Sequence, residues 1–134
     1  MEIQVTVENH VNTFCETPGG ACRLLDWVPG LGLAFDPSHM IMQDQDLSPW
    51  TLLFPRVRHV RIRDASDSMM QSRMGMGKLK PADLLDMPGI LSYSGILIVE
   101  HLRPSQSGAG EYDIKADIGT AREAAVKALG GMRN

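Results

Sequence analysis

Four short apolar runs alternate along the chain with amphipathic or turn-rich segments. The apolar runs predict strands at residues 2–7, 31–35, 57–63 and 95–99. Helical spacing of apolar residues, with a proline at or just before three of the four starts, predicts helices at 19–28, 50–54, 81–87 and 113–129. Strand and helix therefore alternate four times. This order is typical of an α/β fold with parallel strands and helices packed outside them.

The predicted strands have two unlike sides. In 31–35, glycine and alanine alternate with leucine and phenylalanine, so one side is narrow and the other is bulky. In 57–63, Val60 and Ile62 face one way and should meet helices. The side chains that face the other way are basic: His59, Arg61 and Arg63. Inward-pointing basic groups are costly unless acids or a ligand meet them.

The remaining segments are predicted to be loops, at 9–16, 40–47, 65–78 and 102–110. The last two are rich in Gly, Ser and either Met or Pro, and 40–47 carries two aspartates. No interdomain linker separates the elements, and 134 residues suit one domain, 1–134.

An acidic residue ends each predicted strand, and a histidine lies in or just after each of them. The acids are separated by 28, 28 and 36 residues, which is the length of one strand–helix unit. The four acids are Glu8, Asp36, Asp64 and Glu100. Carboxyl ends of parallel strands meet at one edge of a sheet, where ligands bind in α/β folds. We therefore expect a shared polar site there.

Charge and composition exclude several function classes. The formal net charge of −3 and the absence of a basic block argue against a nucleic-acid partner. No apolar run approaches the roughly 20 residues of a membrane span. No signal peptide is recognisable, so Cys15 and Cys22 are expected to be reduced, Cys22 as a packing residue, in a cytoplasmic protein.

Three carboxylates that converge, Glu8, Asp36 and Glu100, repel one another unless a cation or protons compensate them. Carboxylates with nearby imidazoles suit a divalent ion such as Mg²⁺, Mn²⁺ or Zn²⁺. Such an ion would polarise a carbonyl or hydroxyl group of a bound sugar while a neighbouring carboxylate moves a proton. Taken singly, each acid or histidine is more often a cap, a solvated loop residue or a structural group.

Five segments resemble the C-terminal half of the xylose isomerase-like TIM barrel superfamily. Residues 5–10 (Val-Thr-Val-Glu-Asn-His), 35–39 (Phe-Asp-Pro-Ser-His), 59–64 (His-Val-Arg-Ile-Arg-Asp) and 98–101 (Ile-Val-Glu-His) are similar to the family's fifth to eighth strands. Residues 70–77, with Gly-Met-Gly, are similar to the loop after its seventh strand. The resemblance implies four βα units, equivalent to half of a (β/α)₈ barrel.

The resemblance also implies roles for individual residues. Glu8, Asp36 and Glu100 would hold the divalent metal, and Glu8 and Glu100 would also carry protons as catalytic residues. The residues that would contact a small sugar or sugar-phosphate substrate are His39, His59, Arg61 and Arg73.

One position departs from the family pattern. The family usually has a metal-binding histidine two residues after the position of His59, and this chain has Arg61 there. Arginine stays protonated and cannot ligate a metal. Either three carboxylates and water still hold an ion, or the Arg61 guanidinium itself neutralises the acids in a metal-free site.

Length is the second departure, because a full barrel needs about 250 residues. Four units leave two open sheet edges and an inner face with no opposite wall. We therefore expect either a homodimer that pairs two halves or a missing N-terminal half-barrel.

The leading hypothesis is a sugar or sugar-phosphate isomerase or epimerase that uses a divalent metal. A metal-dependent phosphodiesterase of the abasic-site endonuclease kind is less favoured, because the chain offers few histidine ligands and no basic DNA-facing surface. The alternative is a non-catalytic or truncated half-barrel, a ligand-binding or assembly subunit whose metal site is degraded by Arg61.

Overall fold

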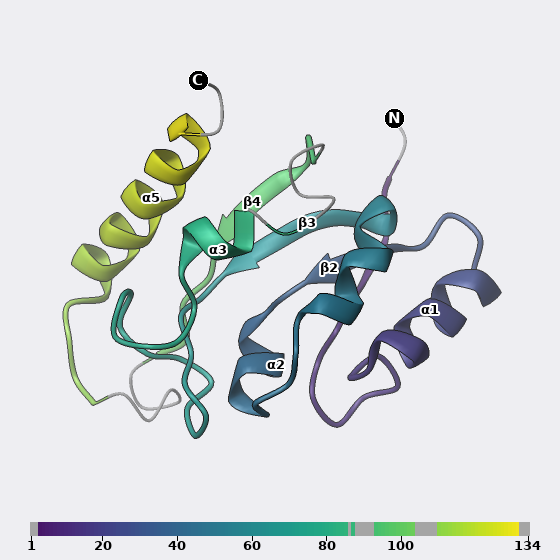
Figure 1. Cartoon of the computed structure of the whole chain (residues 1–134), viewed down its shortest axis with the longest axis horizontal. Helices are drawn as coiled ribbons and strands as arrows, with labels where there is room; N and C mark the ends of the chain where they lie inside the picture. Colours follow the sequence, from purple (N-terminus) through teal and green to yellow (C-terminus); the bar gives the residue numbers. More distant parts are fainter. Residues whose placement is uncertain (1–2, 86, 88–92, 104–109, 132–134) are drawn as a thin grey trace.

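Strands and helices alternate along the chain in the computed structural model, which describes residues 3–85, 87, 93–103 and 110–131 (Figure 1). The elements are β1 (Thr6–Glu8), α1 (Pro18–Trp27), β2 (Gly32–Phe35), α2 (Ser38–Met42), η1 (Ser48–Arg56), β3 (Val57–Ile62), α3 (Pro81–Leu85), β4 (Ile96–Val99) and α5 (Ile114–Gly131). Here η1 is a 3₁₀ helix.

The four strands form one sheet in the order β1-β2-β3-β4, and every neighbouring pair is parallel. Each connection carries helix, as parallel pairing requires. This confirms the predicted fold class: four consecutive βα units with parallel strands, corresponding to part of a TIM barrel. The pairing of β2 with β3 contains a register irregularity between Leu33 and Ala34.

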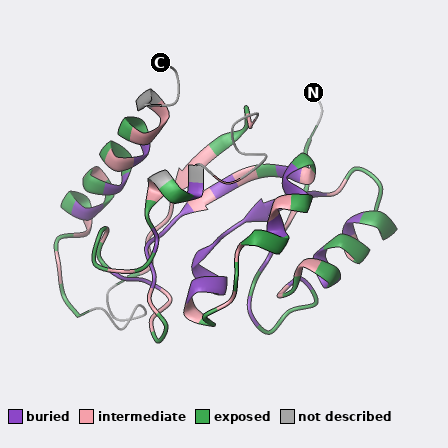
Figure 2. Cartoon of the chain, viewed as in Figure 1, coloured by how far each residue is buried: buried purple, intermediate pink, exposed green. Residues whose placement is uncertain are grey.

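One face of the sheet is covered by helices. The β2 and β3 side chains that point to this face are fully buried: Leu33, Phe35, Val60 and Ile62. Phe35 packs against two aromatic rings of η1, with centroids 5.8 Å from Trp50 and 5.4 Å from Phe54. Burying each such side chain contributes about 1.5–3 kcal/mol. In Figure 2 β2 is buried along its length, whereas α1 and α5 expose their outer sides.

The opposite face has no helical cover among the described residues. Its side chains include Ala34, His59 and Arg61. The register pairs Ala34 with His59, and it pairs His59 and Arg61 with Ile96 and Ile98 of β4. Ile96 is 66% exposed. The predicted division of 57–63 into an apolar and a basic side is therefore confirmed, with Val60 and Ile62 under the helices.

Local sequence signals explain where α1 begins and ends. The Thr17 hydroxyl accepts a hydrogen bond from the amide of Gly20, and Pro18 fills the first helical position. The helix ends before Pro29-Gly30, where Gly30 has a φ of +86°.

The structure corrects three predictions of detail. Residues 38–42 form α2, whereas 40–47 was expected to be entirely loop. The helix expected at 50–54 is part of a longer 3₁₀ helix, Ser48–Arg56, with Pro55 inside its last turn. Cys22 is exposed rather than packed, and it is Cys15 that is buried; both are free thiols. Part of the predicted strand 2–7, helix 81–87 and loop 102–110 lies outside the described residues.

Within the described ranges, no helix combines the length and the apolar composition needed to cross a membrane.

Candidate active site at the carboxyl ends of the strands

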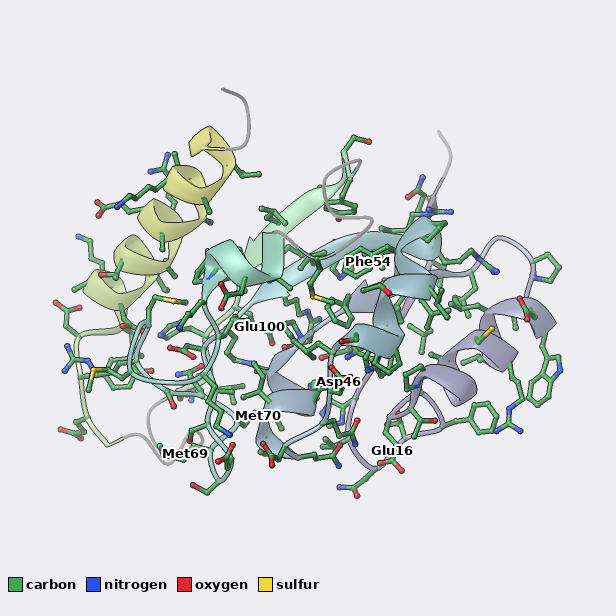
Figure 3. The ribbon with its side chains drawn as sticks, in the orientation of Figure 1. Glu16, Asp46, Phe54, Met69, Met70 and Glu100 are labelled. Atoms are coloured by element: carbon green, nitrogen blue, oxygen red, sulfur yellow. The ribbon has the colours of Figure 1, made fainter. Side chains whose placement is uncertain are left out.

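Charged side chains from all four strands meet at the carboxyl edge of the sheet. Glu8 is the last residue of β1, Arg61 lies in β3, and Glu100 directly follows β4. They line a cavity of about 190 Å³ whose other lining residues are His10, His39, Arg63, Met70 and Leu102. In Figure 3, Glu100 lies near the middle of the molecule and Met70 lies below it on the loop after β3.

The Arg61 guanidinium joins the acids of the first and last strands. Its Nη1 lies 2.7 Å from Glu8 Oε1 and 2.9 Å from Glu100 Oε2. The three side chains are only 24–28% exposed, so water screens this cluster less than it would a surface pair. A single nitrogen of one arginine thus compensates the carboxylates at the ends of the first and the fourth strand of the sheet.

Arg63 compensates the third carboxylate. Asp36 is fully buried, and its Oδ2 pairs with Arg63 Nη2. Asp36 Oδ1 accepts hydrogen bonds from the Ser38 amide at 2.9 Å and the Ser38 hydroxyl at 2.5 Å, and Arg63 Nε donates to the same hydroxyl at 3.0 Å. Arg63 Nη1 also lies 3.6 Å from Glu100 Oε1. Asp36 therefore has both the charge partner and the hydrogen bonds that a buried carboxylate needs.

His39 connects Glu8 to the buried end of β2. Its Nε2 lies 3.1 Å from Glu8 Oε1 and 3.8 Å from Asp36 Oδ2. The hydrogen bond from His39 lowers the pKa of Glu8 below its ordinary value, and the positive charge of Arg61 lowers it further, against the opposing effect of burial. The His10 ring packs on His39, with centroids 4.2 Å apart.

Two of the predicted substrate contacts lie outside the lining of this cavity. His59 is half-buried on the uncovered face, where burial first and the charge of Arg61 second lower its pKa, while Glu8 and Glu100 oppose the shift. Arg73 is exposed, with its guanidinium carbon 5.9 Å from the centroid of the Tyr112 ring. The structure thus brings together Glu8, Asp36, Glu100, His39 and Arg61 but not His59 or Arg73.

The fourth strand-end acid, Asp64, does not join the cavity. Its Oδ1 accepts hydrogen bonds from the amides of Ala65 and Leu79, both at 2.9 Å, and its Oδ2 from Gly75 at 2.8 Å and Gly77 at 2.9 Å. Asp64 therefore fixes the two ends of the 65–79 loop to each other and has no oxygen left for a substrate.

The sequence placed Arg63 on the inward side of its strand but did not identify Asp36 as its partner, and it assigned no role to Asn9. Asn9 is fully buried; its Oδ1 accepts from the Asp36 amide at 2.7 Å, and its Nδ2 donates to the Asp36 carbonyl at 2.9 Å. Alternation along 57–63 gave a usable signal for Arg63. Nothing in the local sequence of Asn9 distinguishes this role from that of an ordinary loop asparagine.

The donor set of this cavity does not fit a divalent metal. Glu8, Asp36 and His39 each place one potential ligand atom within 4.8 Å of the others. The same groups, however, are already bonded: Glu8 Oε1 to Arg61 and His39, and Asp36 Oδ2 to Arg63. A metal ion would have to displace the guanidinium groups of Arg61 and Arg63 from these oxygens, and their positive charges would remain nearby. These residues fit two guanidinium cations instead.

A larger concavity lies elsewhere. It has a volume of about 430 Å³ and lies between the segment after α2 and α3, with Asp46, Lys78 and Leu84 among its lining residues. None of the strand-end acids lines it, so the smaller cavity remains the candidate active site.

Residues 1–127 match the family described as the xylose isomerase-like TIM barrel. The chain belongs to this family. The match covers nearly the whole sequence and confirms the resemblance that the four strand motifs indicated. No curated protein matches this xylose isomerase-like chain at a significant level.

Two solved structures share the fold. The 3-keto-D-glucoside 4-epimerase YcjR from E. coli is 18% identical with a TM-score of 0.54, over 87% of this chain and 39% of the epimerase. The probable 3-DHS dehydratase AsbF of Bacillus anthracis, involved in petrobactin synthesis, is 17% identical with a TM-score of 0.64, over 96% of this chain and 49% of that protein. This xylose isomerase-like chain therefore spans less than half the length of either structure.

Proposed function

We propose that the chain supplies the C-terminal half of the active site of an enzyme that isomerises or epimerises a sugar or a sugar phosphate. The observation that carries the proposal is the convergence of Glu8 and Glu100 on one guanidinium inside a cavity. Membership of the xylose isomerase-like family and similarity in fold to an epimerase and a dehydratase support it.

Glu8 and Glu100 are the proposed proton carriers. Isomerisation or epimerisation next to a carbonyl removes a proton from carbon and returns it, so two carboxyl groups flanking the carbon can exchange these roles. The lowered pKa of Glu8 keeps its carboxylate ionised, which is the form that accepts a proton, although the same shift makes it a weaker base. The Arg61 guanidinium would stabilise negative charge that develops on the carbonyl oxygen.

Substrate contacts are proposed for His39 and Arg61 within the cavity and for His59 and Arg73 beside it. His39 and Arg61 both line the cavity, so a ligand bound there would lie against their side chains. Arg73 would have to leave the Tyr112 ring to reach a ligand at the strand ends.

The test is exchange of carbon-bound hydrogen with solvent deuterium in a panel of ketoses, 3-keto sugars and their phosphates, followed by NMR. Exchange by the native protein and its loss in both Glu8→Gln and Glu100→Gln are expected. Glu123→Gln is the matched control, because Glu123 is exposed on α5. Unchanged exchange in both active-site variants would rule out the proposal.

The second candidate is a non-catalytic half-barrel that binds a ligand or assembles with another subunit. It is favoured by the length of the chain, which covers 39% and 49% of the two neighbouring structures. Ligand binding detected by chemical-shift changes at His39, without deuterium exchange in any substrate, would favour this candidate over the enzyme.

A further inference from the structure

We propose that the Arg61 guanidinium is the resident cation of the strand-end site and takes the place of a divalent metal. This inference refines the proposed function, but it concerns ion binding and can be tested without any turnover.

With this arginine present, the charges at the strand ends sum to a single negative charge. Glu8, Asp36 and Glu100 contribute three formal negative charges, and Arg61 and Arg63 contribute two positive ones. A divalent ion added to this set would leave an excess of positive charge in a half-buried cluster, at a cost in desolvation and repulsion. Without Arg61, two negative charges would remain uncompensated, and one divalent ion would neutralise them.

The position of Arg61 makes it the decisive cation of the two. Arg63 is 3% exposed and is bound to Asp36 and to the Ser38 hydroxyl, so it belongs to the packed end of β2. Arg61 is 25% exposed and reaches into the cavity, where it contacts the carboxylates of both edge strands. Arg61 therefore bridges the two acids electrostatically, as a metal ion bound between them would.

Replacement of Arg61 by histidine should therefore create a metal site. An imidazole on the uncovered side of β3 would supply a neutral nitrogen in place of a fixed charge, next to Glu8, Glu100 and His39. Oxygen and imidazole donors together suit Mn²⁺, Co²⁺ or Zn²⁺.

The experiment is calorimetric titration of the tag-free, chelator-treated chain with Mn²⁺ and with Co²⁺. The visible spectrum of Co²⁺ reports its coordination. The native protein is expected to bind neither ion in the micromolar range. Arg61→His should bind at least about tenfold more tightly than the native chain, and Glu8→Gln in the Arg61→His background should remove the gain.

Arg58→His is the matched control, because Arg58 is exposed on the same strand and its Nη1 bonds to the carbonyl of Pro55 rather than to an acid. It should not gain metal affinity. Micromolar binding by the native chain that Glu8→Gln abolishes would overturn the proposal, and this titration decides the matter even if Arg61→His does not fold. A folded Arg61→His with native affinity would overturn it as well. These titrations measure metal binding only, whereas deuterium exchange in the Glu8 and Glu100 variants tests the proposed enzymatic function. Either proposal can therefore fail without the other.

Discussion

At the scale of single residues, the position of the acids was predictable, whereas their pairing with Arg61 was only one of two alternatives. Glu8, Asp36 and Glu100 could be placed at one edge because each follows an apolar run, and the ends of parallel strands coincide. That Arg61 Nη1 would join two of these acids depends on how far its side chain reaches from β3 toward the ends of β1 and β4. The alternation of residues predicts the face of the strand on which Arg61 lies, but not which acids its guanidinium contacts. For this reason the sequence alone left both a metal-bound and a metal-free site as alternatives.

The ionised form of Glu8 should contribute to stability in a pH-dependent way. Its pKa is lower in the folded chain than the ordinary 4.5, so the contribution is present above about pH 4.5 and is lost as the pH falls through the folded pKa. We expect Glu8→Gln to lower the free energy of unfolding at pH 7 by about 1 kcal/mol or more. The difference from the native chain should shrink in acid, as measured by urea denaturation.

Glu123→Gln, on the exposed side of α5, should show no such pH-dependent difference. A Glu8→Gln variant whose deficit is the same at pH 7 and pH 3 would contradict the assignment of a low pKa to Glu8.

At the scale of elements, the long periodic helix and the short strands were predicted within a few residues, whereas the short helix after β2 was not predicted. The helix at Ile114–Gly131 has apolar residues at helical spacing over several turns, and its prediction differed by a residue or two at each end. The five-residue α2 is too short to show a period. It is held by its tertiary setting, since Ser38, His39, Met40 and Ile41 are all buried.

Residues 65–78 were predicted to be a loop, and the order of this loop comes from hydrogen bonds to Asp64. Both oxygens of this carboxylate accept two backbone amides each. Asp64→Asn would place an NH₂ group against two of these amides whichever way it turns, leaving them unpaired. We expect a loss of about 2 kcal/mol or more in stability and faster hydrogen exchange at Gly75 and Gly77.

Asp67→Asn is the control within the same loop, because Asp67 is more than half exposed and pairs only with Lys78 among the described residues. It should be nearly neutral. Equal hydrogen exchange in the two variants would show that Asp64 does not hold the loop.

Close packing of Gly77 against Asp64 gives a second expectation for this loop. A Cβ atom at residue 77 would lie 2.3 Å from Asp64 Oδ1 and 2.4 Å from the Ala65 carbonyl oxygen. Gly77→Ala should therefore destabilise the chain by about 1–3 kcal/mol in thermal or urea unfolding. Gly119→Ala is the matched comparison: nothing lies within 4 Å of its Cβ position on α5, so it should stabilise the helix by about 0.5–1 kcal/mol. The reverse order of stability would refute this explanation.

At the scale of the whole molecule, the sequence predicted the half-barrel but could not show what faces it. The four parallel strands are confirmed, and β1 and β4 are the two sheet edges. Apolar side chains are exposed near both edges, with Ile3 at 78%, Val5 at 61% and Ile96 at 66%. What covers them depends on a second set of strands, and no pattern within this chain encodes that partner.

We expect a second copy of the chain to cover this face. A two-fold pairing would set β4 of each copy beside β1 of the other and leave no free edge. Light scattering after size exclusion should then give twice the chain mass of 14.7 kDa. Ile96→Lys should weaken the dimer, whereas Leu52→Lys, at an 83% exposed position on the helical side, should not. A native protein that stays monomeric at high concentration would exclude the identical pairing and favour a separate N-terminal half.

The double hydrogen bond between Asn9 and the backbone of Asp36 has a consequence for how this site can vary over time. The side-chain amide of Asn9 pairs with the N–H and C=O groups of Asp36 as a peptide unit of a neighbouring strand would. It therefore extends the pairing of β1 and β2 by one residue beyond the ends of the two strands. Insertions or deletions in the segment beyond Asn9 could then reshape the rim of the site, and with it substrate choice, while the anchored aspartate stays in place. An aspartate at position 9 would accept hydrogen bonds but not donate them at neutral pH, so it could not make the bond from Asn9 Nδ2 to the Asp36 carbonyl.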